Sequence, residues 1–311
     1  MRFREGARLD TSGVQDRRGR RGGGRSGGRA GGRGLAVGGG GLGVVGLLVV
    51  VLFQVLGGGG GDTAGLASTL GGLSGGQTAD NSELAANCRT GADANASVEC
   101  ALVADIESIQ DHWGATLGPD YRPADTVFFA GSVQTGCGGA TSGSGPFYCP
   151  ADEQVYIDLS FFDDLQTRFG AAGGAFVNAY VLAHEYGHHV QHLLGTNRLV
   201  TPGETGPASG TVRLELQADC YAGTWANRAE SVPDDSGAPL IADITDDDID
   251  RALDTAGRIG DDFIQTELGG GTVDQDAFTH GSSEQRRQWF STGYATGDPA
   301  QCDTFGTDDV G

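Results

Sequence analysis

The sequence contains no lysine, so all 20 of its basic residues are arginines. This bias points to no particular function. Basic charge is also scarce after residue 34, because residues 1–34 hold ten arginines and three acidic residues, whereas residues 35–311 hold ten arginines and 38 acidic residues. The two parts carry net charges of +7 and −28, which sum to the −21 of the whole chain. Because a part this acidic repels a phosphate backbone, nucleic acid is not an expected partner.

Cys-x-x-Cys pairs are absent as well, which disfavours a metal site built from cysteines. All six cysteines lie after residue 80, and an even number of them outside a membrane favours disulfides. We predict that Cys88–Cys100 and Cys137–Cys149 each close a short loop, and that Cys220–Cys302 ties the C-terminal region to an earlier helix. The spacing leaves other pairings open.

The first 80 residues divide into three regions of different composition. Residues 1–34 are rich in arginine and glycine and have few large apolar side chains, so we expect a disordered, basic, cytoplasmic tail. Residues 35–56 contain no charge and would span about 33 Å as a helix, enough to cross a bilayer. Residues 57–80 predict a Gly/Ser-rich linker to a globular domain over residues 81–311.

The apolar segment 35–56 has two interpretations, a cleaved signal peptide and an uncleaved transmembrane helix. The basic region before it is long and no clear Ala-x-Ala site follows it, which favours the uncleaved anchor. The arginine excess on its N-terminal side then predicts a single-pass protein of the cell membrane, with a cytoplasmic N-terminus and an extracytoplasmic domain.

Apolar periodicity and capping residues predict an α+β domain with several helices and a small sheet. The expected helices cover residues 97–113, 161–169, 175–194, a segment from about 211 to 228, 246–263 and 282–294, and the expected strands cover 126–130 and 154–158. Three aspartates open the helix at 246, and their spacing does not match a calcium-binding EF-hand loop.

The sequence His184-Glu-Tyr-Gly-His188 lies in the helix expected from residue 175. Residues four positions apart project from the same helix face, so His184 and His188 can hold one metal ion between them. Glu185 lies next to this pair, where it can polarise a water molecule without being a ligand. An amphipathic helix with a chance match is the alternative for this motif alone.

A second pair of residues, Glu215 and Asp219, is also spaced four apart on an expected helix. A catalytic zinc ion needs a third protein ligand, for which we predict Glu215. Asp219 would accept a hydrogen bond from the free ring N–H of a ligand histidine. His192, one turn beyond His188 on the same face, is the alternative as a fourth ligand, but Glu215 explains the site better. His189 faces away from the pair and is expected to serve packing or to lie at the surface.

The chain resembles the putative neutral zinc metallopeptidase family (the YpfJ-type membrane proteins) of the gluzincin clan over roughly residues 81–305. The resemblance is carried by residues 145–150, 156–162, 183–191, 215–220 and 260–262, and by His280-Gly-Ser-Ser through Arg286 and Trp289. It implies a zincin-like fold and a membrane-anchored peptidase. It also implies Zn²⁺ as cofactor, with His184, His188 and Glu215 as ligands and Glu185 as catalytic base.

We therefore expect a zinc-dependent endopeptidase that hydrolyses peptide or protein substrates. The strand 154–158 is the expected sheet edge for an extended substrate. His280 is the candidate donor to the developing oxyanion, ahead of Tyr186 and Tyr294, although a structural histidine is an equal alternative. The other functions that remain open are a non-hydrolytic zinc-binding partner in the cell envelope and a structural envelope protein. Glu185 argues against the first, because a site that only binds zinc does not need it, and a closed fourth coordination position would support the second.

Overall fold

The computed structural model describes residues 1–19, 79–234 and 236–311. The predicted transmembrane helix at 35–56 lies outside this part of the chain, as do residues 20–34 and the predicted linker up to residue 78. Among the described residues, no helix has the length and apolar character needed to cross a bilayer.

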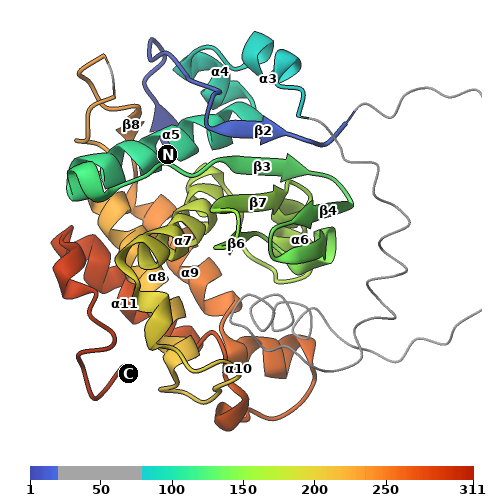
Figure 1. Ribbon diagram of the computed structural model, residues 1–311, viewed down its shortest axis with the longest axis vertical. Helices are drawn as coiled ribbons and strands as arrows, with labels where there is room; N and C mark the ends of the chain where they lie inside the picture. The colour runs from blue at the N-terminus through green and yellow to red at the C-terminus, as the bar shows by residue number, and fades with distance from the viewer. Residues whose placement is uncertain (20–78, 235) are drawn as a thin grey trace, which may run out of the picture.

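Runs of short strands and runs of helices follow one another along the described chain (Figure 1). The helices are α3 (Ser82–Asn87), α4 (Gly91–Ala96), α5 (Val98–Leu117), α6 (Phe161–Thr167), α7 (Ala175–Leu194), α8 (Gly210–Arg228), α9 (Asp246–Arg258), α10 (Asp261–Phe263) and α11 (Ser283–Thr296). The strands are β1 (Arg2–Phe3), β2 (Val14–Asp16), β3 (Thr126–Phe129), β4 (Ser132–Thr135), β5 (Gly138–Thr141), β6 (Phe147–Cys149), β7 (Gln154–Asp158) and β8 (Ile241–Asp243). This content agrees with the predicted α+β class.

A four-stranded sheet with the order β2-β3-β7-β6 lies beside α7 (Figure 1). Strands β2, β3 and β7 are parallel, and β6 runs antiparallel to β7. The prediction that residues 154–158 form the sheet edge is therefore wrong, because β7 pairs with a strand on each side. The edge nearest α7 is β6, a strand of only three residues between Pro146 and Pro150.

Helix α7 runs through the core and ends where the sequence predicted. Its apolar face buries Phe176, Val177 and Tyr180. Gly195 follows the last turn at φ +78°, and its N–H bonds to carbonyls of that turn. A left-handed cap of this kind favours glycine, because a Cβ atom would be strained there.

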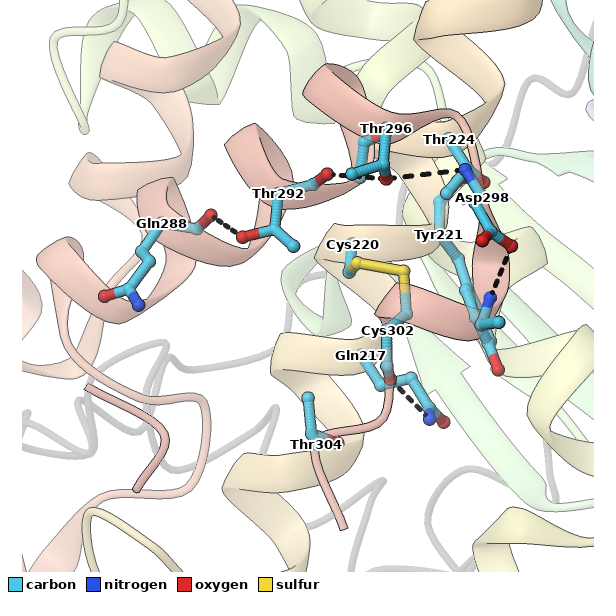
Figure 2. The surroundings of a disulfide bond; sticks show 12 residues. Gln217, Cys220, Tyr221, Thr224, Gln288, Thr292, Thr296, Asp298, Cys302 and Thr304 are labelled. Carbon is cyan, nitrogen blue, oxygen red and sulfur yellow. Dashed lines mark hydrogen bonds between the residues drawn. A yellow bond between two sulfur atoms is a disulfide. The ribbon is translucent and has the colours of Figure 1, made fainter. Parts of the chain in front are cut away.

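Helices α8 and α11 cross at very close range. A Cβ atom on Gly293 would lie 1.9 Å from the Cys220 carbonyl oxygen, and one on Gly223 would lie 2.2 Å from the Phe290 carbonyl oxygen. Glycine at both positions therefore lets the two backbones touch. The disulfide Cys220–Cys302 fastens the C-terminal region to α8 near this crossing, and Gln217 Nε2 donates to the Cys302 carbonyl at 2.9 Å (Figure 2).

The structure confirms all three predicted disulfides. Cys88–Cys100 and Cys137–Cys149 each span 12 residues, and Cys220–Cys302 spans 82. It corrects the helix predicted over residues 246–263, which stops at Arg258 and restarts at Asp261. The interruption brings Gly260 against the start of α11, where a Cβ atom would lie 2.5 Å from the Ser283 nitrogen.

The prediction of a disordered tail over residues 1–34 is wrong for residues 1–19. Strand β1 pairs with β8, and β2 joins the sheet beside β3. Phe3 and Val14 are 3% and 1% exposed in the main core. The prediction of disorder rested on the average composition of residues 1–34, which does not show that Phe3 and Val14 are buried.

His112 predicts a pH dependence of stability. Its ring is buried in α5 beside Trp113, and burial, with a smaller effect of Arg228, lowers its pKa from 6.5 to about 4. The unfolded chain takes up this proton near pH 6.5 and the native protein does not, so stability falls as the pH drops from about 6.5 to 4. The expected loss at pH 5 is about 2 kcal/mol relative to neutral pH.

We would measure this loss by urea unfolding of the wild type and the His112→Gln variant at pH 7.5 and pH 5. Glutamine does not titrate, so the free energies of unfolding of the two proteins should converge by about 2 kcal/mol at the lower pH. An unchanged difference between them would mean that His112 is protonated equally in both states.

Candidate metal centre

His184, His188 and Glu215 come together between α7 and α8. The three residues each offer one ligand atom, and these atoms lie within 4.8 Å of one another. His184 Nε2 lies 3.1 Å from Glu215 Oε2, and His188 Nε2 lies 3.5 Å from Glu215 Oε1. Two imidazole nitrogens and a carboxylate are a donor set that suits zinc and leaves a further position for water.

Hydrogen bonds on the far side of each ring fix both histidines. Nδ1 of His184 donates to Asp219 Oδ1 at 2.8 Å, the position expected for Asp219 from the sequence. Nδ1 of His188 donates to Gln191 Oε1 at 2.8 Å, and Gln191 Nε2 donates to the Leu214 carbonyl at 2.7 Å. Both Nε2 atoms consequently face Glu215. Sequence reasoning missed Gln191, although its spacing of three from His188 puts it on a neighbouring part of the helix surface.

Asp219 is itself held by two side chains that the sequence analysis did not place at the site. Arg286 Nε donates to Asp219 Oδ2 at 2.9 Å, and Arg286 Nη2 donates to Oδ1 at 3.1 Å. Tyr180 OH donates to the same Oδ1 at 2.6 Å. Asp219 is 0% exposed and Arg286 is 2% exposed, so this ion pair is shielded from water.

The electrostatics of the cluster suit a cation. Both ring nitrogens of His184 face carboxylates. Burial disfavours the charged ring, but Asp219 and then Glu215 outweigh it and raise the pKa of His184 to about 10. Burial likewise opposes ionisation of Glu215, yet His188 and His280 hold its pKa well below its usual range. The site therefore takes up positive charge as protons, which a metal ion bound at the Nε2 atoms would replace.

Glu185 lies in the cleft next to these residues without joining the ligand group. It is 9% exposed, and the backbone N–H of Tyr148 in β6 donates a hydrogen bond to its carboxylate. Burial raises the pKa of Glu185, and the neighbouring His184 and His188 partly oppose this increase. A carboxylate whose pKa is raised toward neutrality is suited to accept and return a proton.

A cleft opens along the ligands between β6, α6 and the start of α11. Its walls include aromatic and aliphatic side chains: Phe147, Tyr148, Phe161, Phe169, Val181, Leu214, Ile259 and Ile264. Its polar lining includes the metal-binding side chains together with Glu185 and His280. The cleft thus combines an apolar wall with one polar centre, the usual character of a small-molecule or peptide site.

His280 lines the same cleft from the loop before α11. The backbone N–H groups of Thr279, His280 and Gly281 donate to Asp261 Oδ2 at 2.7, 2.7 and 3.0 Å. The His280 ring Nδ1 lies 3.5 Å from Asp261 Oδ1. Asp261, which is 3% exposed, therefore fixes both the loop and the ring.

The other candidate side chains do not reach the centre. Tyr186 OH donates to the Ala124 carbonyl at 3.0 Å, on the sheet side of α7. Tyr294 stacks on Phe290 and is not among the residues that line the cleft.

The two remaining histidines of α7 are engaged elsewhere. His189 is fully buried, accepts from Tyr148 OH at 3.0 Å and donates to the Arg122 carbonyl at 2.6 Å, so it serves packing. His192 lines the cleft, but its Nε2 lies 3.4 Å from Glu153 Oε1 rather than at the ligand group.

The chain is similar to a protein family and to several bacterial proteins. A family model described as "Putative neutral zinc metallopeptidase" matches residues 1–305. The uncharacterized protein Rv2575 of Mycobacterium tuberculosis (strain H37Rv) is 50% identical over 225 residues, which are 72% of this chain and 76% of that protein. The uncharacterized protein YpfJ of Escherichia coli K12 is 44% identical over 211 residues, 65% of this chain and 69% of that protein. No solved structure matches the chain.

Proposed function

Because this chain belongs to the putative neutral zinc metallopeptidase family, we propose that it is a zinc-dependent endopeptidase with its active centre at His184, His188 and Glu215. The observation that carries the proposal is Glu185, a buried carboxylate in the cleft beside three convergent metal-binding side chains. A site that only binds zinc has no need of this additional acid.

The proposed mechanism divides the work among residues of the cleft. When bound, a zinc ion acts as a Lewis acid that activates water and polarises the scissile carbonyl. Glu185 takes a proton from the attacking water and returns it to the leaving nitrogen. His280, held by Asp261, donates a hydrogen bond to the carbonyl oxygen as negative charge develops on it. Asp219 keeps the His184 ring in its orientation.

Strand β6 is the proposed docking edge for the substrate backbone. Among the described residues it pairs with β7 alone, so its other edge can bond an extended peptide. The apolar wall formed by Phe161, Phe169 and Ile264 would accept a large apolar side chain next to the scissile bond.

We also propose an extracytoplasmic location for the catalytic domain. The three disulfides support this location, because such bonds persist in oxidising compartments.

The test is digestion of a diverse peptide mixture by the purified full chain, read by mass spectrometry. We expect new termini next to large apolar residues, their loss after chelator treatment, and their return when zinc is restored. If the zinc-loaded protein produces no new termini, the peptidase proposal fails and a non-hydrolytic zinc-binding role in the envelope takes its place.

A further inference from the structure

We propose that residues 1–19 lie in the same compartment as the catalytic domain, because they form part of its fold. This inference concerns topology and holds whether or not the centre hydrolyses peptides. It replaces the expectation that the N-terminus is cytoplasmic while the domain lies outside.

The N-terminal segment contributes strands to two different sheets. Strand β2 pairs in parallel with β3, with Val14 opposite Thr126 and Asp16 opposite Phe128. Strand β1 pairs antiparallel with β8, with Arg2 opposite Asp243. Figure 1 shows β2 as the outer strand of the main sheet, beside α3 and α4. The segment therefore supplies β2, an edge strand of the four-stranded sheet.

Side chains of the domain recognise the backbone of this segment. The Asn95 side chain bonds both the N–H and the carbonyl of Phe3, each at 2.9 Å. The Asn81 side chain accepts from the Asp16 N–H at 2.8 Å and donates to the Val14 carbonyl at 2.5 Å. Because these bonds are made to backbone groups, they specify an extended chain in one register.

The fit at Gly91 is close. A Cβ atom there would lie 2.0 Å from the Arg4 carbonyl oxygen, so the first turn of α4 and the N-terminal segment touch backbone to backbone. Such a contact requires a chain held in one place on the surface. Together with the buried Phe3 and Val14, it makes the segment part of the packed domain.

Charge pairing weakens the argument that favoured a cytoplasmic N-terminus. Arg4 Nη2 lies 2.8 Å from Asp234 Oδ2, and Arg18 lies 2.5 Å from Glu99 and 2.6 Å from Asp16. Arg4 and Arg18 are therefore neutralised within the fold. The positive-inside rule applies to free basic loops, and these two arginines should not be counted in it.

The topological consequence follows from connectivity. The two folded parts are joined by the 59 residues 20–78. A chain that crossed a membrane once between them would place β2 and β3 on opposite sides, where they cannot pair. An exchange of N-terminal segments between two copies would meet the same obstacle. The family model begins at residue 1, so the segment belongs to the matched pattern.

Thiol labelling in spheroplasts tests the shared compartment. All six cysteines form disulfides, so the full chain gives no background reaction. We would compare Gly6→Cys, at a position with open space around it, with Thr201→Cys on an exposed loop of the domain. A membrane-impermeant maleimide should label both variants to the same extent before lysis, and both fully after lysis. Labelling of only one of them before lysis would overturn the proposal.

A cross-linking experiment on the full chain tests the docked position itself. Arg2→Cys combined with Asp243→Cys places two thiols at paired positions of β1 and β8, within the range that a disulfide spans. Peptide mass spectrometry after mild oxidation should recover this link, and should not recover one from the control Glu5→Cys with Asp243→Cys. Absence of the link in the first variant, with the native disulfides intact, would show that the segment is not docked.

Discussion

Glu185→Gln is expected to lower kcat/KM about 10³-fold, the scale at which a positioned general base contributes to hydrolysis. Glutamine keeps the shape of the side chain but cannot take the proton of the attacking water. His184, His188 and Glu215 are unchanged in this variant, so zinc content should stay at the wild-type level. The measurement is the cleavage rate of a peptide found in the mixture digest, together with the metal content of the same samples.

Glu267→Gln is the matched control, because it makes the same chemical change at an exposed position. It should leave both cleavage and zinc content unaltered. If the zinc-loaded Glu185→Gln protein cleaved the peptide at the wild-type rate, another group would have to act as the base. The proposed role of Glu185 would then be rejected even though the zinc site stands.

Arg286→Ala is expected to cost about 3–5 kcal/mol of folding stability, the typical result of removing one partner from a buried ion pair. The variant leaves Asp219 ionised, 0% exposed, and without its two bonds from the guanidinium. Because Asp219 orients His184, we also expect zinc affinity to fall about 10–100-fold. Urea unfolding and competition with a zinc-binding dye measure the two effects separately.

The neighbouring Arg287 provides the control, because its side chain is exposed and its Nε donates to the Leu253 carbonyl at 3.1 Å. Arg287→Ala should change stability by well under the Arg286→Ala loss. Arg286→Lys should recover part of the stability but not the two-pronged contact, because an ammonium cannot span both carboxylate oxygens. Equal losses in Arg286→Ala and Arg287→Ala would mean that the ion pair does not support the centre.

Local helix geometry explains why the candidate ligands could be predicted. His184 and His188 are one turn apart, and so are Glu215 and Asp219, so each pair had to share a face once its helix formed. The choice of Glu215 as their partner came from the donor set that zinc prefers. The end of α7 at Gly195 was also predictable from local sequence, because glycine readily adopts the left-handed conformation that ends a helix.

The contacts that sequence reasoning missed join distant parts of the chain. Arg286 lies 67 residues after Asp219, and nothing in the spacing reveals that α11 crosses α8. Strand β6 has only three residues, too few to show an alternation of apolar and polar side chains, and the prediction of residues 154–158 as the sheet edge therefore omits it. Phe3 and Val14 are isolated apolar residues in a polar segment, and Val14 pairs with Thr126, 112 positions later. The average composition of residues 1–34 does not reveal such isolated apolar residues.

The pairing of β1 with β8 also has a consequence during synthesis. Arg2 and Phe3 leave the ribosome long before their partners at residues 241–243. At typical translation speeds the segment must wait roughly 10–50 s for that strand to be made. Throughout this interval β1 is open to pairing with other chains, and β2 is open to such pairing until β3 has been made. The charged residues Asp16, Arg17 and Arg18 at the end of β2 would discourage such association while the nascent protein is incomplete.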